Sequence, residues 1–447
     1  MKKRFHRWYH RTYAFNRSLR DRLTPPGAFF VVMFFIAFFF GLNTQKSMVF
    51  EILSLLTALL LVSRLIEWPF KPRITAERLF PRYGTVGTPV RYRIALKNEG
   101  KRREAGLVLL EEPCDPRPTY DEWANTPEQG EEKRNWFDRR MLYYRWEWLI
   151  AKRLGATFES AAVPPLAPGE TRDIDMYLTP TKRGIIRLEG CRVERADLFG
   201  IWKRGVLLPC PGALISLPRI YRVNRPEFCG HRRYHQGGIA DARKAGDSEE
   251  FMQVREYRPG DPLKKIHWRS TARTGMLAVK EFQDEYYARI GLILDTFRKE
   301  SFSEELEEAV SIAASYLVGG GGGDEIIELM FVGAEAFSFS VGRGTGSPDR
   351  MLEILAGVEP CRDRNFAELT RLVGERLELL CGTVVILTDI DESRKELLAR
   401  LDAAPVDHLT LLITADPEKM RRRLTELAVG NVHIVEVGKV QEALTTL

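Results

Sequence analysis

The densest set of side chains able to bind an ion or move a proton lies in one stretch, VREYRPGDPLKKIHWRSTARTGMLAVKEF, at residues 254–282. Its candidate site residues are cations, rings and one carboxylate: Arg255, Tyr257, Arg258, Asp261, His267, Trp268, Arg269, Arg273 and Lys280. Catalysis would need a nucleophile beside a base, and we expect no serine or cysteine at a suitable spacing from His267. Seven Lys or Arg against three Asp or Glu give the stretch a formal charge of +4. The pattern predicts binding of an anion or an acidic protein surface, or a clasp between two neighbouring domains.

The local signals within this stretch predict a short helix followed by a strand. Asp261 and Pro262 follow a Pro-Gly pair, so we expect Asp261 to be the N-cap of a helix that runs to about Ala272. Gly275 is well placed to end that helix, and MLAVKEF then reads as a strand.

Two aspartates offer a different chemistry, because each follows a predicted buried strand: Asp295 in LILDTF and Asp389 in VILTDID. The carboxyl ends of parallel strands meet at one edge of a sheet, where two carboxylates can hold Mg²⁺ through oxygen ligands. Arg298 and Lys299 follow the first aspartate, and a positive charge at such a place repels a metal. We therefore expect no resident metal or cofactor, and expect both aspartates to cap the helices that follow them.

Two further motifs favour simple structural roles. Cys229, His231 and His235 in CGHRRYHQGG have zinc-ligand chemistry, but the adjacent glycines disfavour the helix that a His-x3-His pair needs, which favours a basic loop. The glycine run 319–323 follows a predicted helix and lacks the Lys-Ser or Lys-Thr of a phosphate loop, so it is predicted to be a connection between a helix and a strand.

The elements that must position these residues change character along the chain. Residues 289–447 alternate buried strands with amphipathic helices, which predicts a doubly wound parallel α/β domain. Residues 74–225 contain short alternating runs typical of a small antiparallel β-sandwich or barrel, and residues 226–288 are predicted to be a linker. An insertion at 113–160 is rich in aromatic side chains, which would lie on a membrane surface or pack against the sandwich.

The N-terminal part predicts a membrane anchor. Gly27–Leu42 and Met48–Ile66 are two apolar runs, so residues 27–66 are predicted to be a two-helix transmembrane hairpin. Residues 1–26 hold eight Lys or Arg and one acid, which places both the N-terminus and the C-terminal domains in the cytoplasm. The same segment interleaves cations with aromatic rings and is expected to bind anionic membrane lipids rather than a specific nucleic acid. The six scattered cysteines fit a reducing compartment.

The stretch from Arg255 to Phe282 meets every position of the pattern R-x-Y-x-x-G-D-x-x-[RK]-x-I-x-W-x-x-[ST]-A-R-x-x-x-L-x-V-[KR]-x-[FY]. It thereby resembles the bacterial family called domain of unknown function 58. Two upstream segments, PTKRGIIRLEGCRVERADLFGIWKR and PRYGTVGTPVRYRIALKNEG, are similar to further strands of that family, with Leu198 where the family has proline. The resemblance implies a two-helix anchor, a β domain and a von Willebrand factor A-like domain. It also implies a partnership with a MoxR-type AAA+ ATPase and, in some members, with a transglutaminase-like membrane protein. The Asp-x-Ser-x-Ser metal motif of the von Willebrand fold is absent, because Asp295 is followed by Thr-Phe-Arg-Lys.

These observations predict a membrane-anchored scaffold or adaptor that is not an enzyme and binds protein partners. One alternative is an Mg²⁺-dependent receptor or hydrolase that uses Asp295 and Asp389. A second alternative is a protein whose surface binds anionic lipid or another polyanion, which would lose affinity as salt rises.

Overall fold

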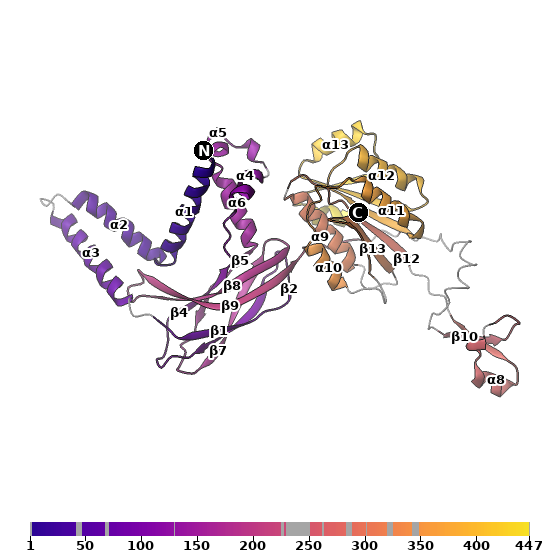
Figure 1. Cartoon of the computed structure of the whole chain (residues 1–447), viewed down its shortest axis with the longest axis horizontal. Coiled ribbons are helices and arrows are strands. Elements are labelled where there is room, and N and C mark those ends of the chain that lie inside the picture. The colour runs from indigo at the N-terminus through magenta and orange to yellow at the C-terminus, as the bar shows by residue number, and fades with distance from the viewer. Residues whose placement is uncertain are drawn as a thin grey trace. The chain divides into compact units, whose positions relative to one another are not determined.

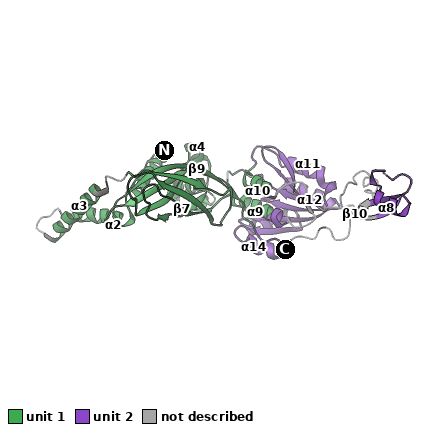
Figure 2. Ribbon diagram, turned by 90° about the horizontal axis from the view of Figure 1, so that it is seen from below, with its two compact units in different colours: residues 1–220, 298–314, 349–360 green, residues 221–297, 315–348, 361–447 purple. Residues whose placement is uncertain are grey.

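The computed structural model describes residues 2–41, 47–67, 71–128, 130–224, 228, 251–261, 263–282, 288–300, 302–319, 325–341 and 348–446. The chain divides into two compact units (Figure 2). Unit 1 comprises Met1–Ile220, Arg298–Ala314 and Asp349–Pro360, and unit 2 comprises Tyr221–Phe297, Ser315–Pro348 and Cys361–Leu447.

Two β-sheets form the centre of unit 1 (Figure 1). One has four strands in the order β1-β3-β7-β5, and the other has five in the order β2-β9-β8-β4-β6. Neighbouring strands are antiparallel, except that β2 and β9 are parallel. The strands are β1 (Ile74–Leu79), β2 (Tyr83–Thr85), β3 (Val90–Asn98), β4 (Leu107–Pro113), β5 (Ala156–Phe158), β6 (Ala161–Val163), β7 (Thr171–Pro180), β8 (Gly184–Ala196) and β9 (Lys203–Leu217).

The two sheets share one apolar core. Along β3 the buried residues Ile94 and Leu96 are separated by a more exposed one, because successive side chains of a strand point to opposite faces. They belong to the same buried cluster as Leu109 of β4 and Val193 of β8, which are strands of the other sheet. The alternation read from the sequence therefore corresponds to a sandwich with one face of each sheet turned inward.

The insertion between β4 and β5 is mostly helical: α4 (Tyr120–Asn125), a 3-10 turn (Glu131–Lys133), α5 (Trp136–Met141) and α6 (Tyr143–Leu154). These helices pack against the N-terminal helix α1 (Lys2–Arg20). Tyr9, Trp123 and Trp146 are buried together, and the Tyr9 hydroxyl donates to the Met141 carbonyl oxygen at 2.9 Å. The aromatic insertion thus forms a second small core with the basic N-terminal helix. The sequence had predicted contact with a membrane surface or with the sandwich, and not with this helix.

Two apolar helices follow α1: α2 (Pro25–Gly41) and α3 (Ser47–Glu67). Among the described helices, α3 carries the one stretch that is long and apolar enough to cross a membrane, Met48–Leu65, and only 6% of it is buried. A core helix of a soluble protein would be mostly buried, so this exposure indicates membrane association. The apolar part of α2, Pro25–Phe40, is shorter than a span requires, and the loop 42–46 lies outside the described residues, so the predicted two-helix hairpin is not confirmed.

Part of the predicted linker is folded. β10 (Phe251–Glu256) and β11 (Ala278–Phe282) pair as an antiparallel ribbon, and a 3-10 turn (Leu263–Lys265) and α8 (Trp268–Thr274) lie between them. We call residues 251–282, Pro262 excepted, the hairpin module. The strand expected in MLAVKEF is present as β11.

Unit 2 is built on a six-stranded sheet with the order β14-β13-β12-β15-β16-β17. Every neighbouring pair is parallel except β13 and β14, which are antiparallel. The strands are β12 (Ala288–Leu294), β13 (Glu325–Val332), β14 (Ala336–Val341), β15 (Gly382–Leu387), β16 (Asp407–Thr414) and β17 (Val432–Glu436). The helices of this half of the chain are α9 (Glu304–Gly319), α10 (Pro348–Ala356), α11 (Ala367–Arg376), α12 (Glu392–Ala403), α13 (Pro417–Glu426) and α14 (Val440–Thr446), with a 3-10 turn at Leu377–Leu379. Of these, α9 up to Ala314 and α10 from Asp349 belong to unit 1.

The strand order explains the continuous apolar runs in this half of the chain. All six residues of β15 are buried, as expected for a central strand covered on both faces. Ile293, Val385 and Leu412 from three neighbouring strands share a core with Leu369 of α11 and Leu398 of α12. The mostly parallel α/β sheet predicted from the sequence is therefore present, with β14 as an antiparallel edge strand.

Candidate functional site

The hairpin module is closed by a charged turn. Arg255 donates from Nη1 and Nη2 to the two oxygens of Asp261, at 2.7 and 2.8 Å, and the Arg258 backbone N–H donates to Asp261 Oδ2 at 2.8 Å. The hydrogen bonds from Arg255, and then that from Arg258, lower the pKa of Asp261 to about 2. This carboxylate therefore holds β10 against the turn that follows it.

The expectation that Asp261 caps a helix to about Ala272 is wrong. The segment after Asp261 is a 3-10 turn, and α8 begins only at Trp268, with His267 at the N-cap position. The reason is competition for the carboxylate, because a two-point bond to a guanidinium is stronger than a single bond to a helix N–H. The predicted end of the helix is confirmed, since Gly275 takes a left-handed conformation (φ 72°) directly after Thr274.

His267 lies at the junction of α8 and β11. Its backbone N–H donates to the Ala278 carbonyl oxygen at 2.8 Å, and the Ala278 N–H donates to Thr271 Oγ1 at 3.1 Å. The His267 Nδ1 atom lies 2.7 Å from Ser270 Oγ, so the expectation of no serine within reach is wrong. The i, i+3 spacing on the first helical turn brings the two side chains together.

Most of the remaining predicted residues lie on the surface of the hairpin module. Ile266, Ala278 and Val279 are buried, whereas Trp268 is 67% exposed. Leu263, Met276 and Leu277 are exposed as well, beside the exposed cations Arg258, Arg269 and Arg273, while Tyr257 and Lys280 are half-buried. The packing of the hairpin module itself uses neither the indole nor the Arg269 and Arg273 guanidinium groups, so they are available for either expected role, a clasp between domains or a surface that receives a partner.

A second polar cluster lies where the strand order of the unit 2 sheet reverses, between β12 and β15. Crevices outside the strand ends at such a reversal are the usual ligand sites of open α/β sheets. Asp295 follows β12 and is completely buried. Its carboxylate accepts from the Thr388 N–H and Oγ1, both at 3.1 Å, and from the Phe297 N–H at 3.0 Å.

Arg394 of α12 completes this cluster. It donates to Asp295 from Nε at 2.8 Å and from Nη2 at 3.2 Å, and its Nη1 donates to Asp391 at 2.7 Å. The guanidinium also lies over the Phe366 ring, 4.8 Å from the centroid. Burial lowers the pKa of Arg394, but Asp295, Asp391 and Asp389 together outweigh burial and raise the pKa above its ordinary value. A buried arginine therefore holds the place beside Asp295 that a metal ion would need.

The expectation that Asp295 and Asp389 cap the helices that follow them is also wrong. Asp389 pairs with Arg423 of α13 at 2.7 Å, and Asp391, not Asp389, is the N-cap of α12. Asp295 caps no helix, because its oxygens are used by Arg394 and by loop atoms. Within the part of the chain that the structure describes, no group of three or more His, Cys, Asp or Glu could hold a metal ion.

Reasoning from the sequence missed Arg394, Thr388 and Ser270. Arg394 lies 99 positions from Asp295, and its charge alone does not distinguish it from other arginines on amphipathic helices. The local signal was its position in the first turn of the helix that follows β15, because that turn lies close to the carboxyl end of the strand. The proposed basic loop around Cys229, His231 and His235 and the glycines 320–323 lie outside the described residues.

The sequence pattern of the family described as "Protein of unknown function DUF58" matches residues 253–437. The match covers the hairpin module and the six-stranded sheet of unit 2. The uncharacterized protein YeaD of Bacillus subtilis (strain 168) is 25% identical over 206 residues, which is 46% of this chain and 50% of YeaD. The chain thus aligns with about half the length of that relative.

The solved structures that match this chain have low TM-scores and do not show its fold. The CARDB domain of a Pyrococcus furiosus protein matches with a TM-score of 0.16 and 13% identity, over 32% of this chain and 95% of that domain. An exo β-N-acetylglucosaminidase of Vibrio harveyi matches with a TM-score of 0.15 and 7% identity, over 74% of this chain and 60% of the enzyme.

Proposed function

We propose that this protein is a membrane-anchored, non-enzymatic adaptor that holds an acidic partner protein on its hairpin module. The observation that carries the proposal is the exposure of Trp268 beside Arg269 and Arg273. Tryptophan and arginine dominate the binding energy of protein interfaces, and an exposed pair of this kind serves no packing within the hairpin module. The cations suit a partner with a negative surface, because complementary charge speeds and orients docking.

The exposed apolar side chains of the module support the same proposal. A two-stranded ribbon is marginally stable in water unless a third layer covers it. Among the module's side chains whose burial the structure describes, Ile266, Ala278 and Val279 are buried, whereas Leu263, Trp268, Met276 and Leu277 are exposed. A bound partner would cover those apolar side chains and stabilise the ribbon.

The resemblance to the family extends the proposal to a partner and a location. The partner is a MoxR-type AAA+ ATPase, in some settings together with a transglutaminase-like membrane protein. The anchor is a two-helix hairpin made by α2 and α3, which leaves both soluble units in the cytoplasm. The α/β sheet is a von Willebrand factor A-like domain.

The Mg²⁺-dependent alternative is disfavoured by one observation. Arg394 donates to both oxygens of Asp295, and a guanidinium and a divalent cation cannot share those lone pairs. The proposal therefore needs neither a metal nor a cofactor.

The test is binding of a purified MoxR-type ATPase to the full chain in detergent, measured by biolayer interferometry. Trp268→Ala and Arg269→Ala are expected to weaken binding by about 2 kcal/mol, roughly 30-fold, which is the range of interface hot spots. Arg371→Ala is the matched control, because this arginine is 74% exposed on α11 and lies outside the hairpin module. Binding should also weaken steeply as salt is raised.

Equal affinity of Trp268→Ala, Arg269→Ala and wild type would remove the hairpin module from the interface. Turnover of a substrate that is lost in Ser270→Ala or His267→Ala would contradict the non-enzymatic part of the proposal.

A further inference from the structure

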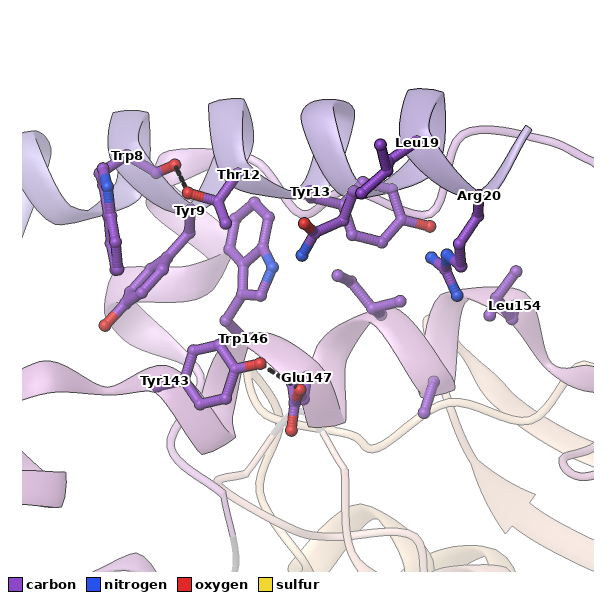
Figure 3. Close-up of a pocket in the computed structure, with 13 residues that line it drawn as sticks. Trp8, Tyr9, Thr12, Tyr13, Leu19, Arg20, Tyr143, Trp146, Glu147 and Leu154 are labelled. Carbon is purple, nitrogen blue, oxygen red and sulfur yellow. Dashed lines mark hydrogen bonds between the residues drawn. The ribbon is translucent and has the colours of Figure 1, made fainter. Parts of the chain in front are cut away.

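Helices α1 and α6 lie side by side, with an open groove of about 670 Å³ between them (Figure 3). They touch through rings at one end, where the Tyr9 ring lies 5.6 Å from that of Tyr143 and 5.9 Å from that of Trp146. Further along, the lining includes the small residues Thr12 of α1 and Ala151 of α6 beside larger ones such as Tyr13 and Ile150. The helices therefore leave a groove between them, of a size that suits a small amphiphilic ligand.

The lining of the groove is mostly apolar, with Thr12, Asn16 and Glu147 as its uncharged polar and acidic residues, and it is cationic at one end. Tyr13, Trp146 and Leu154 supply apolar surface, and Arg20 lies at the end where α1 stops (Figure 3). Glu147 is the one carboxylate among the lining residues, and it accepts a hydrogen bond from the Tyr143 hydroxyl. A ligand that fits this lining has a long apolar part and a single anionic end at Arg20.

The cationic end of the groove lies where the chain enters its apolar helices. Arg20 ends α1, and α2 begins at Pro25, before the stretch Met48–Leu65 that can cross a membrane. α1 itself carries seven Lys or Arg and no Asp or Glu.

α1 also has an exposed apolar stripe at the edge of the groove. Trp8, Phe15 and Leu19 are spaced i, i+7 and i+11, which places them on one face of the helix, and all three are exposed. Trp8 and Leu19 also line the groove, whereas Phe15 does not. An apolar stripe flanked by cations is typical of a helix that lies in a membrane–water interface.

We propose that the groove between α1 and α6 holds one acyl chain of an anionic phospholipid from the surrounding membrane, with the headgroup phosphate on Arg20. The inference rests on the membrane anchoring in the proposed function and adds a defined lipid site to it. The charge of α1 favours an anionic lipid over a neutral one. The short connection from α1 to α2 keeps the groove within reach of the bilayer.

The test is native mass spectrometry of the full chain in non-ionic detergent, with dioleoylphosphatidylglycerol or dioleoylphosphatidylcholine as the probe. Wild type is expected to retain one phosphatidylglycerol in preference to phosphatidylcholine. Ala151→Trp fills the groove from α6 and is expected to reduce retention at least tenfold. Thr12→Phe fills it from α1 and is expected to do the same, which covers the case in which the first variant fails to fold.

Two matched controls separate the groove from general attraction to lipid. Arg20→Gln is expected to abolish the preference for phosphatidylglycerol, whereas Arg4→Gln, an exposed cation outside the lining, is expected to preserve it. Phe15→Ala, on the exposed stripe but outside the lining, is expected to retain lipid as wild type does.

The proposal would be overturned if both groove-filling variants retained phosphatidylglycerol as wild type does. That result is expected if the groove holds a peptide and the lipid binds elsewhere. Equal effects of the Arg20 and Arg4 variants on lipid preference would also overturn it. If the membrane anchoring in the proposed function is wrong, the wild-type chain will stay in solution without detergent. If only the groove proposal is wrong, wild type and the groove variants will all remain in the membrane fraction.

Discussion

Replacing Arg394 with methionine removes the guanidinium from the buried Asp295 and keeps most of the apolar stem. The Asp295 carboxylate then retains the two Thr388 donors and the Phe297 N–H but loses both bonds from Arg394. Asp295 has no exposed surface, so water cannot replace them. Leaving one partner of a buried ion pair uncompensated costs about 3–5 kcal/mol.

Hydrogen exchange of the full chain, read by mass spectrometry on peptides from β12 and β15, measures this loss where it occurs. A cost of about 3–5 kcal/mol corresponds to a hydrogen-exchange rate that is higher by a factor of roughly 10² to 4 × 10³, since 1.4 kcal/mol is a factor of ten. A double variant, Asp295→Leu with Arg394→Met, is expected to recover most of the stability, because an apolar pair can replace a buried ion pair.

Arg371→Met is the control, because its exposed pair with Glu375, at 3.8 Å, should be worth about 0–1 kcal/mol. The reasoning fails if Arg394→Met exchanges no faster than this control. It also fails if millimolar Mg²⁺ slows exchange in the wild type, because that would require a metal where Arg394 lies.

The hairpin module should lose order in acid. The pKa of Asp261 is lowered from 3.8 to about 2, so its contribution to stability is present above pH ~4 and is lost as the pH falls towards 2. Hydrogen exchange of β10, corrected for the intrinsic effect of pH, should show this step, and Asp261→Asn should lack it. Tyr9→Ala should destabilise the insertion by about 3–5 kcal/mol, because it empties a buried aromatic site, and should hasten its proteolysis, whereas Phe15→Ala on the exposed face of α1 should not. An insertion that resists protease equally in both variants would show that α1 does not support it.

Local patterns predicted much of the fold. The two sheets of unit 1 follow from short alternating runs, and the parallel sheet of unit 2 follows from buried strands that alternate with helices. Gly275 ended its helix as expected, because the left-handed conformation it adopts costs glycine almost nothing. Each of these features depends on neighbours within a few positions.

The candidate sites were predicted less well. The residues of the hairpin module were identified, but the predicted role of Asp261 as a helix N-cap was wrong. Its carboxylate instead accepts two hydrogen bonds from Arg255. The aromatic insertion was recognised, but its packing against α1 was not, because Tyr9 and Trp146 are far apart in sequence and several apolar surfaces could have covered them. Exposure of Trp268 could not be read from its neighbours at all.

The sequence by itself determined the periodicities of the strands and helices, the apolar stretch of α3 and the excess of positive charge on α1. Only the tertiary structure decided that Arg394 neutralises Asp295 and that α1 and α6 line a groove. The physical reason is that periodicity and charge are properties of the chain alone. The strength of an ion pair and the shape of a cavity depend on distance and burial in space, which are set when distant segments pack together.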